Sequence, residues 1–262
     1  MSELIVSLPT DPGLREAIGD EAGVTFLTWD LDGPAPSERF DLVVPPYWGG
    51  NRQLAQLEGV DTRLVQWQSI GYNGVTKYLP AEVPLANAAT VHETSTAELA
   101  LALTLAAQRG IPEFVRDATE HRWDLRSFPS IADRRVLLIG YGGVSKAIEA
   151  RLAGFEVSIA RLARTAREET NLAGETVVVH SFSELHTQLA QAEIVILAVP
   201  LTDETRGLID AAALAALPDD ALLVNVARGP VVDTEALIAE LRAGRLRAAL
   251  DVTDPEPLPP DH

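Results

Sequence analysis

Residues 136–145 read Val-Leu-Leu-Ile-Gly-Tyr-Gly-Gly-Val-Ser, and this stretch decides the fold. A continuous apolar run that ends in clustered glycines predicts a buried strand, a tight turn and the start of a helix. Such a turn lets the backbone approach a pyrophosphate, which the positive N-terminus of the helix favours. The third glycine of the pattern is replaced by Ser145, which is small enough to be tolerated. The turn predicts dinucleotide binding by Gly140, Gly142, Gly143, Val144 and Ser145; the alternative is a glycine turn without a ligand.

The chain that surrounds this turn, from about residue 93 to residue 262, alternates apolar strands with helices. The predicted strands are Arg135–Ile139, Glu156–Ile159, Val177–His180, Ile194–Ala198, Leu222–Val226 and Ala248–Asp251. The predicted helices are Val144–Ala153, Ser183–Gln191, Asp210–Leu217 and Thr234–Ala243. Strands that are apolar on both faces are typical of a doubly wound parallel sheet, so residues 93–262 are predicted to form a nucleotide-binding domain of the Rossmann type.

Residues 1–92 repeat the α/β alternation on a smaller scale. The predicted strands are Leu4–Leu8, Val24–Trp29, Asp41–Val44, Leu64–Gln68 and Leu85–Asn87, with helical stretches at Pro12–Glu21 and Asn51–Gly59. This pattern predicts a second, smaller α/β domain of parallel strands. The boundary falls near His92–Thr94, where a Thr/Ser-to-Glu helix-start signature begins a helix from Ser95 to about Thr119. That helix is apolar almost all round, which indicates burial or packing against another subunit.

Composition excludes several classes of function. The 262 residues carry a net charge of −17, which disfavours nucleic acid and anionic membranes as partners. Cysteine is absent, which excludes disulfides, thiolate metal sites and cysteine nucleophiles, and no metal site is predicted. The longest apolar run, Leu99–Ala107, is far shorter than a membrane helix, and Met-Ser-Glu lacks the positive start of a signal peptide. The expectation is a cytoplasmic globular protein.

The residue that follows the second strand of such a domain helps to select the cofactor. An acidic residue there binds the adenosine ribose hydroxyls of NAD. The sequence predicts Arg161 at this place, with Arg164 and Arg167 close behind. Guanidinium groups suit a 2′-phosphate by charge and by bidentate geometry, so NADP is the predicted cofactor, with NAD possible. The alternative is a solvated basic loop.

Further candidate residues follow later strands of both domains. Ligands of open α/β sheets bind outside the carboxyl ends of the strands. These ends supply a cation at Arg228, a carboxylate at Glu256 and a glycine turn at Ile70-Gly71. Singly, each is explained equally well as a surface charge or a bend, but together they predict a ligand site. Tyr47, Trp48 and Tyr72 either line that site or belong to the core.

The chain resembles the D-isomer-specific 2-hydroxyacid dehydrogenases, a family that includes glyoxylate/hydroxypyruvate reductases and phosphoglycerate dehydrogenases. The resemblance rests on the motifs Ser69-Ile-Gly-Tyr72, His92-Glu-Thr-Ser-Thr-Ala-Glu98, Gly140-Tyr-Gly-Gly143, Pro200-Leu-Thr-Asp-Glu-Thr-Arg-Gly207, Asn225-Val-Ala-Arg-Gly229 and Asp251-Val-Thr-Asp-Pro-Glu-Pro257. It implies a split substrate domain with a flavodoxin-like α/β fold, a nucleotide domain, and homodimerisation through the latter with the helix 95–119 as a contact element.

The resemblance also implies roles for individual residues. Arg228 would bind the substrate carboxylate and polarise the 2-oxo group, and the amides of Ile70 and Gly71 would cradle the carboxylate. Glu256 would orient the catalytic histidine and keep it protonated. The implied contacts on the nicotinamide side are Pro200, Val226, Ala227 and Asp251.

One feature of the family pattern is not found in this sequence. The family's catalytic histidine lies in a Thr-Pro-His-like segment beyond the Glu-Pro motif, whereas the histidines here are His92, His121, His180, His186 and His262. Two hypotheses follow for this chain. The first is an NAD(P)-dependent oxidoreductase that converts a small 2-oxoacid to a D-2-hydroxyacid, with impaired turnover. The second is a catalytically silent NAD(P)-binding sensor, and the downstream reading frame would separate the two.

Overall fold

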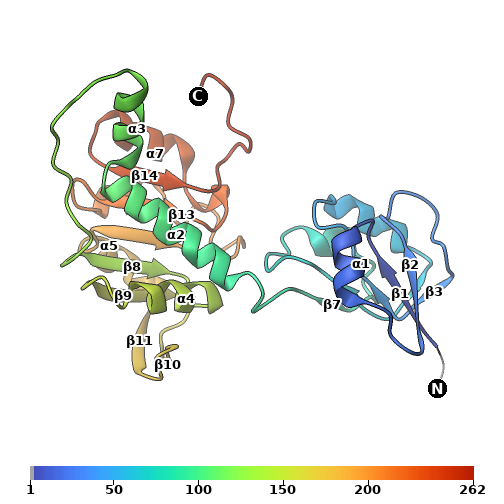
Figure 1. Ribbon diagram of the computed structural model, residues 1–262. Helices are drawn as coiled ribbons and strands as arrows, with labels where there is room; N and C mark the ends of the chain where they lie inside the picture. The colour runs from blue at the N-terminus through green and yellow to red at the C-terminus, as the bar shows by residue number, and fades with distance from the viewer. Residues whose placement is uncertain (1–2) are drawn as a thin grey trace. The chain divides into compact units, whose positions relative to one another are not determined.

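The computed structural model describes residues 3–262, which divide into two compact units, Met1–His92 and Glu93–His262 (Figure 1). Each unit has a parallel sheet of its own. In the described part of the chain, every helix is too short or too polar to span a membrane.

The second unit is built on a seven-stranded sheet with the order β10-β11-β9-β8-β12-β13-β14 (Figure 1). The strands are β8 Arg135–Ile139, β9 Ser158–Ala163, β10 Arg167–Thr170, β11 Thr176–Ser181, β12 Ile194–Leu197, β13 Leu222–Asn225 and β14 Arg247–Leu250. Only the edge strand β10 is antiparallel to its neighbour. The six parallel strands have the 3-2-1-4-5-6 order of dinucleotide-binding domains, which confirms the predicted doubly wound fold.

Helices cover both faces of this sheet because successive strand residues point to opposite sides. Val136 and Leu138 pack in one core with α2 Glu93–Gln108 and α4 Gly143–Leu152. Leu137 and Ile139 pack in the other core. The helices on that side are α5 Leu185–Leu189, α6 Ala211–Ala216 and α7 Thr234–Arg242. Strands apolar on both faces are stable only between two such layers, which explains the continuous apolar runs of the sequence.

The single helix predicted from Ser95 to Thr119 is in fact two helices. The first, α2, ends at Gln108, and α3 covers Ile111–Thr119. Gly110 caps α3 in the left-handed conformation, with φ of 63°, and Pro112 occupies its first turn. The apolar run ends at Ala107, and the residues that signal the break are Gly110, which is typical of a helix end, and Pro112, which is typical of a first helical turn.

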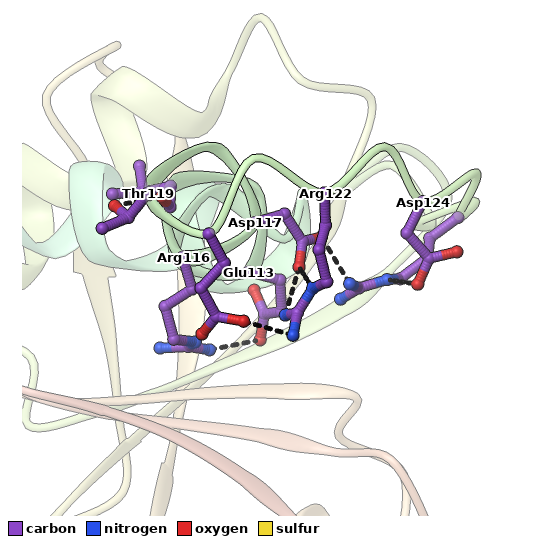
Figure 2. A network of polar contacts seen from close by, with 9 residues as sticks. Glu113, Arg116, Asp117, Thr119, Arg122 and Asp124 are labelled. Carbon is purple, nitrogen blue, oxygen red and sulfur yellow. Dashed lines mark hydrogen bonds and ion pairs between the residues drawn. The ribbon is translucent and has the colours of Figure 1, made fainter.

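Ion pairs hold the segment after α3 against that helix (Figure 2). Asp117, which is buried, accepts from Arg122 at 2.6 Å and also from Arg126. Hydrogen bonds from Arg122 and Arg126 outweigh the effect of burial and lower the pKa of Asp117. Trp123 and Leu125 lie in the segment that these arginines hold, and both are about nine-tenths exposed.

The second strand of the unit begins and ends later than predicted. Strand β9 covers Ser158–Ala163, because Glu156 has a positive φ of 58° and lies in the preceding turn. Arg161 is therefore inside the strand, opposite Leu138 of β8, and the residue after the strand is Arg164. Strand β11 was predicted, but β10, which forms an antiparallel hairpin with it, was not, because β10 consists largely of charged residues.

The first unit has the sheet order β2-β1-β4-β6-β7, which is the 2-1-3-4-5 order of flavodoxin-like domains. These strands are β1 Leu4–Leu8, β2 Val24–Thr28, β4 Leu42–Val43, β6 Val65–Gln66 and β7 Leu85–Ala86, beside a separate pair, β3 Arg39–Phe40 and β5 Asp61–Thr62. Helix α1, Pro12–Ile18, starts at Asp11, whose carboxylate accepts from the Leu14 amide. Within the predicted helical stretch Asn51–Gly59, residues Asn51–Leu57 form a 3₁₀ helix.

Candidate functional site

The candidate site lies at the carboxyl edge of the seven-stranded sheet. The strand register places Ile139, Leu197 and Asn225 side by side, so that the loops after these three strands begin next to one another at the same sheet edge. Backbone hydrogen bonds continue past the strands, from Ala198 to Ile139, from Val226 to Leu197 and from Asp251 to Asn225, at 2.8–3.2 Å. The edge therefore brings together the starts of four loops, at Gly140, Ala198, Val226 and Asp251.

The three glycines of the turn differ in why they lack a side chain. Gly140 has φ of 91°, and a Cβ there would lie 2.5 Å from the carbonyl oxygen of Ala198. A Cβ on Gly143 would lie 2.7 Å from Oε1 of Glu93. Gly142 has an ordinary extended backbone, and a Cβ there would meet no atom of residues 3–262 within 4 Å. Packing against backbone thus requires the first glycine, the third faces only the flexible side chain of Glu93, and the second leaves open space at the start of α4.

Ser145 stabilises the turn in a way that the glycine pattern does not indicate. Its buried hydroxyl donates to the carbonyl of Gly140 at 2.5 Å. A backbone acceptor that the tight turn buries is therefore satisfied, and the serine is accommodated by a hydrogen bond. Val144, between this serine and the glycines, is partly buried at the first turn of α4.

Tyr141 anchors the turn to α4 through a buried polar network. Its hydroxyl donates to Glu149 at 2.6 Å, and the same carboxylate accepts from Arg161 at 2.7 and 2.8 Å and from Asn171 at 3.0 Å. Burial and the contact with Glu149 raise the pKa of Tyr141 to about 12. Burial alone would raise the pKa of Glu149, but the hydrogen bonds from Arg161, Tyr141 and Asn171 outweigh it and the pKa is lowered.

The three arginines predicted near the ribose have different surroundings. Arg161 is only 16% exposed and is paired with Glu149. Arg167 donates to the carbonyl of Tyr141 at 3.1 Å and pairs with Glu169, so it supports the turn from outside. Arg164, the first residue after β9, is 75% exposed, with Glu204 at 3.7 Å. Of the three, Arg164 is the one whose guanidinium stands in solvent at the strand end.

Arg228 follows β13 at the same edge. Its guanidinium donates to the carbonyl of Ala227 at 2.7 Å and forms no ion pair with a carboxylate among residues 3–262. Gly229 permits the loop to pack closely, because a Cβ there would lie 1.9 Å from the carbonyl oxygen of Thr253. The loop of Arg228 and the loop that leads from Asp251 to Glu256 are therefore in contact.

The remaining residues predicted near the nicotinamide divide by burial. Val226 and Ala227 are buried at the base of the Arg228 loop, and Pro200 and Asp251 are exposed at the same edge. Glu256 is exposed in the loop after β14. These placements bring the members of the second unit to one edge; their roles stay predictions.

The first unit places Ile70 and Gly71 in the loop after β6. The carbonyl of Ile70 accepts from Asn87 at 2.9 Å, and that of Gly71 accepts from the indole of Trp67 at 2.9 Å. In a trans peptide the N–H points away from the C=O, so the Ile70 anchor turns the Gly71 amide to the opposite side. Neither amide donates to an acceptor within residues 3–262. Two adjacent amides of this kind are suited to bind a carboxylate.

Sequence reasoning missed Glu149 and Asn171. The available signal was an acidic residue between Ile148 and Leu152 on the buried face of a predicted helix, because buried carboxylates need a charged or hydrogen-bonded partner. Asn171 gave no signal, since the hairpin that carries it was not expected.

Comparison with known proteins identifies the family. Residues 101–262 match the model of the D-isomer specific 2-hydroxyacid dehydrogenase, NAD binding domain. Glyoxylate reductase of Thermofilum pendens is 33% identical over 216 residues, which are 76% of this chain and 61% of that protein. The glyoxylate reductase/hydroxypyruvate reductase of Mus musculus is 26% identical, over 100% of this chain and 84% of that protein.

A solved structure is similar over nearly the whole chain. It is a D-isomer specific 2-hydroxyacid dehydrogenase from Xanthobacter autotrophicus in complex with NADPH and MES. It is 30% identical with a TM-score of 0.77, and the match covers 98% of this chain and 83% of that one. The chain spans about three fifths of the length of the Thermofilum relative. The family model, the sequence identity and the two-unit fold agree, and the chain belongs to the D-isomer specific 2-hydroxyacid dehydrogenase family.

Proposed function

We propose that this protein binds NAD(P) at the turn 140–145 and transfers a hydride between the cofactor and a small 2-oxoacid or D-2-hydroxyacid. The observation that carries the proposal is the open space at Gly142. Packing explains the missing side chain of Gly140, and the side chain of Glu93 restricts the space at Gly143, but no atom of the described chain restricts the space at Gly142. A residue kept small where the fold has room is expected where a ligand approaches the backbone, here a pyrophosphate at the N-terminus of α4.

The substitution Gly142→Val tests this proposal. Because the backbone at 142 is extended and its surroundings are open, we expect the unfolding free energy to fall by no more than about 1 kcal/mol, the scale of a helix-cap change. The valine would occupy the space of the pyrophosphate, so the NADPH dissociation constant should rise at least about tenfold, as measured by fluorescence titration.

The matched control is Gly140→Ala, which has a packing cause. It should lower stability, because the residue has a positive φ and lies against the carbonyl of Ala198. Equal NADPH affinity in the wild type and in Gly142→Val would contradict the proposed cofactor site.

The residues of the site have complementary roles in the proposed reaction. When bound, the reduced nicotinamide supplies the hydride to the 2-oxo carbon. Arg228, whose charge is not neutralised by a carboxylate of the described chain, binds the substrate carboxylate and stabilises the negative charge that develops on oxygen. The amides of Ile70 and Gly71 hold the carboxylate, and Pro200, Val226, Ala227 and Asp251 border the nicotinamide.

The proton for the resulting alkoxide requires a general acid. Glu256 is proposed to orient a protonated histidine, and none of the five histidines of the sequence has the family's Thr-Pro-His context. Loss of a general acid lowers rates by about 10²–10⁴-fold. A polypeptide limited to these 262 residues is therefore proposed to hold the cofactor and to reduce 2-oxoacids slowly, and cofactor binding without any turnover would favour the sensor role.

NADP is the proposed cofactor, with Arg164 as the principal contact of the 2′-phosphate. Strand β9 ends at Ala163, so the position that would carry an acidic residue for NAD is occupied by Arg164, whose guanidinium is exposed. Arg161, which the sequence predicted as the 2′-phosphate contact, pairs with Glu149, and its guanidinium lies over the ring of Tyr141. Its proposed role is to hold Tyr141 in the turn.

We also propose that two copies associate through α3 and the segment after it, in the cytoplasm. The exposed apolar residues there are Ile111, Phe114, Val115, Trp123 and Leu125. Several exposed apolar side chains in neighbouring segments of a globular protein are typical of an interaction site, and symmetric dimers are the commonest assembly.

A further inference from the structure

Three loops of the first unit leave the carboxyl edge of its sheet side by side. They follow β4, β6 and β7, which are neighbouring parallel strands. The loops comprise residues 44–51, 67–74 and 87–91, and they contain no Asp, Glu, Lys or Arg. The chain has 59 charged residues and these three loops contain none of them, although Arg52 and His92 directly follow the first and third loops and Asp11 and Asp30 lie in the loops after β1 and β2 of the same sheet.

Hydrogen bonds join the first two loops at both ends. The side chain of Gln68 donates to the carbonyl of Pro45 at 2.6 Å, and that of Asn51 donates to the carbonyl of Asn73 at 2.8 Å. The chain between Pro45 and Asn51 therefore runs alongside the chain between Gln68 and Asn73. The second of these segments carries the Ile70 and Gly71 amides.

Aromatic side chains occupy the loop that runs beside these amides. Tyr47 and Trp48 pack edge to face with ring centres 4.8 Å apart, and Tyr47 also contacts the ring of His92 at 5.9 Å. Nε2 of His92 lies 2.9 Å from the carbonyl oxygen of Gln68. His92 therefore connects Tyr47 with the loop 67–74, which carries the Ile70 and Gly71 amides. Trp48 is 93% exposed, and Tyr72, next to Gly71, is 52% exposed.

From this juxtaposition we infer that the substrate is a 2-oxoacid whose C3 carries an aromatic or large apolar group. The inference rests on the proposed function, which assigns the substrate carboxylate to the Ile70 and Gly71 amides. Beside them the unit offers aromatic surface, which binds apolar groups by burial and ring stacking. A second carboxylate or a phosphate on the substrate would find no cation in the three loops, so a substrate of that kind is disfavoured by the cost of desolvating its charge.

Calorimetric titration in the presence of saturating NADP⁺ tests the inference without requiring turnover. The ligands are phenylpyruvate, glyoxylate and 2-oxoglutarate. Burial of a phenyl group predicts that phenylpyruvate binds about tenfold or more tightly than either of the others. In Trp48→Ala the ratio of the glyoxylate and phenylpyruvate dissociation constants should fall severalfold, and Trp48→Phe should restore most of it. Ile18→Ala removes an exposed apolar side chain from the same unit and should leave the ratio unchanged.

The outcomes separate this inference from the proposed function. Tight NADP⁺ binding with phenylpyruvate no tighter than glyoxylate, or with 2-oxoglutarate the tightest, would overturn the aromatic substrate class alone. An unchanged ratio of dissociation constants in Trp48→Ala would also overturn the aromatic substrate class, and it would show that Trp48 does not contact the substrate. Failure to bind either NADP⁺ or NAD⁺, or failure to bind any 2-oxoacid, would instead refute the proposed function.

Discussion

At the scale of single residues, Arg161 shows how a charge can mislead an interpretation of sequence. A charged residue after Ser-Ile-Ala predicts the end of a strand, because an isolated charge is costly to bury. The strand continues to Ala163 because Glu149, twelve residues earlier, accepts two hydrogen bonds from the guanidinium. Arg161 lies in β9 and Glu149 lies in α4, so the sequence of neither element alone reveals that the two residues pair.

Substitution of Arg161 and of Arg164 should therefore have different effects. Arg161→Leu leaves the carboxylate of Glu149 without its cation, and we expect a loss of about 3 kcal/mol in unfolding free energy, with NADPH and NADH affinity weakened to the same extent. Arg164→Ala should leave stability nearly unchanged and weaken NADPH alone, by about tenfold for one lost charge-assisted contact. Chemical denaturation and paired cofactor titrations measure both effects.

The double variant Arg161→Leu/Glu149→Gln provides the control. Because it removes the uncompensated charge, it should recover part of the stability that Arg161→Leu loses. A selective loss of NADPH affinity in Arg161→Leu would show instead that this arginine binds the 2′-phosphate.

At the scale of elements, the segment after α3 is positioned both by charge and by an aromatic contact, since the ring of Phe128 packs edge to face on Phe114 of α3 with ring centres 5.4 Å apart. Trp123 and Leu125 of this segment are exposed and do not hold it on the helix, whereas Asp117 pairs with Arg122 (Figure 2) and with Arg126. Most residues of the predicted helix 95–119 are helical, but the turn at Gly110 changes the chain direction between α2 and α3. The segment after α3 then packs against α3.

Asp117→Asn should lower stability in a pH-dependent manner. The pKa of Asp117 is lowered in the folded state, so its contribution is fully present above its unfolded pKa of about 4 and is lost as pH falls through the folded value. The difference in unfolding free energy between wild type and variant should thus be largest near neutral pH and shrink below about pH 4. Denaturant titrations at neutral and acidic pH measure this difference.

The control for that prediction is Asp124→Asn. Its carboxylate is exposed and pairs with Arg126 at 2.8 Å, so the substitution should cost about 1 kcal/mol or less. If Asp117→Asn proved as mild as Asp124→Asn at neutral pH, the ion pairs would not hold the segment.

At the scale of the whole molecule, a net charge of −17 opposes non-specific association, so a dimer needs a local apolar surface. Trp123 and Leu125 provide such a surface at the segment held by Asp117. The proposed dimer thus depends on the same ion pairs that position this segment.

The double substitution Trp123→Asp/Leu125→Asp should convert the proposed dimer to a monomer, because it places two charges in an apolar contact. Sedimentation velocity measures the change in mass. The control Leu172→Asp alters an exposed apolar residue in the turn between β10 and β11 and should leave the mass unchanged. A wild-type monomer at micromolar concentration would disprove the dimer.

The sequence alone determined the two parallel α/β folds, the glycine turn and most strands, because these depend on local periodicity and on residues adjacent in the chain. It also gave the family, through motifs that lie at the ends of strands. Only the tertiary structure decided that Arg161 pairs with Glu149 and that a Cβ on Gly142 would meet open space. It also decided that the loop of Tyr47 and Trp48 lies beside the loop that carries the Ile70 and Gly71 amides. Each of these depends on residues far apart in the chain, and distances between such residues are set by packing rather than by local pattern.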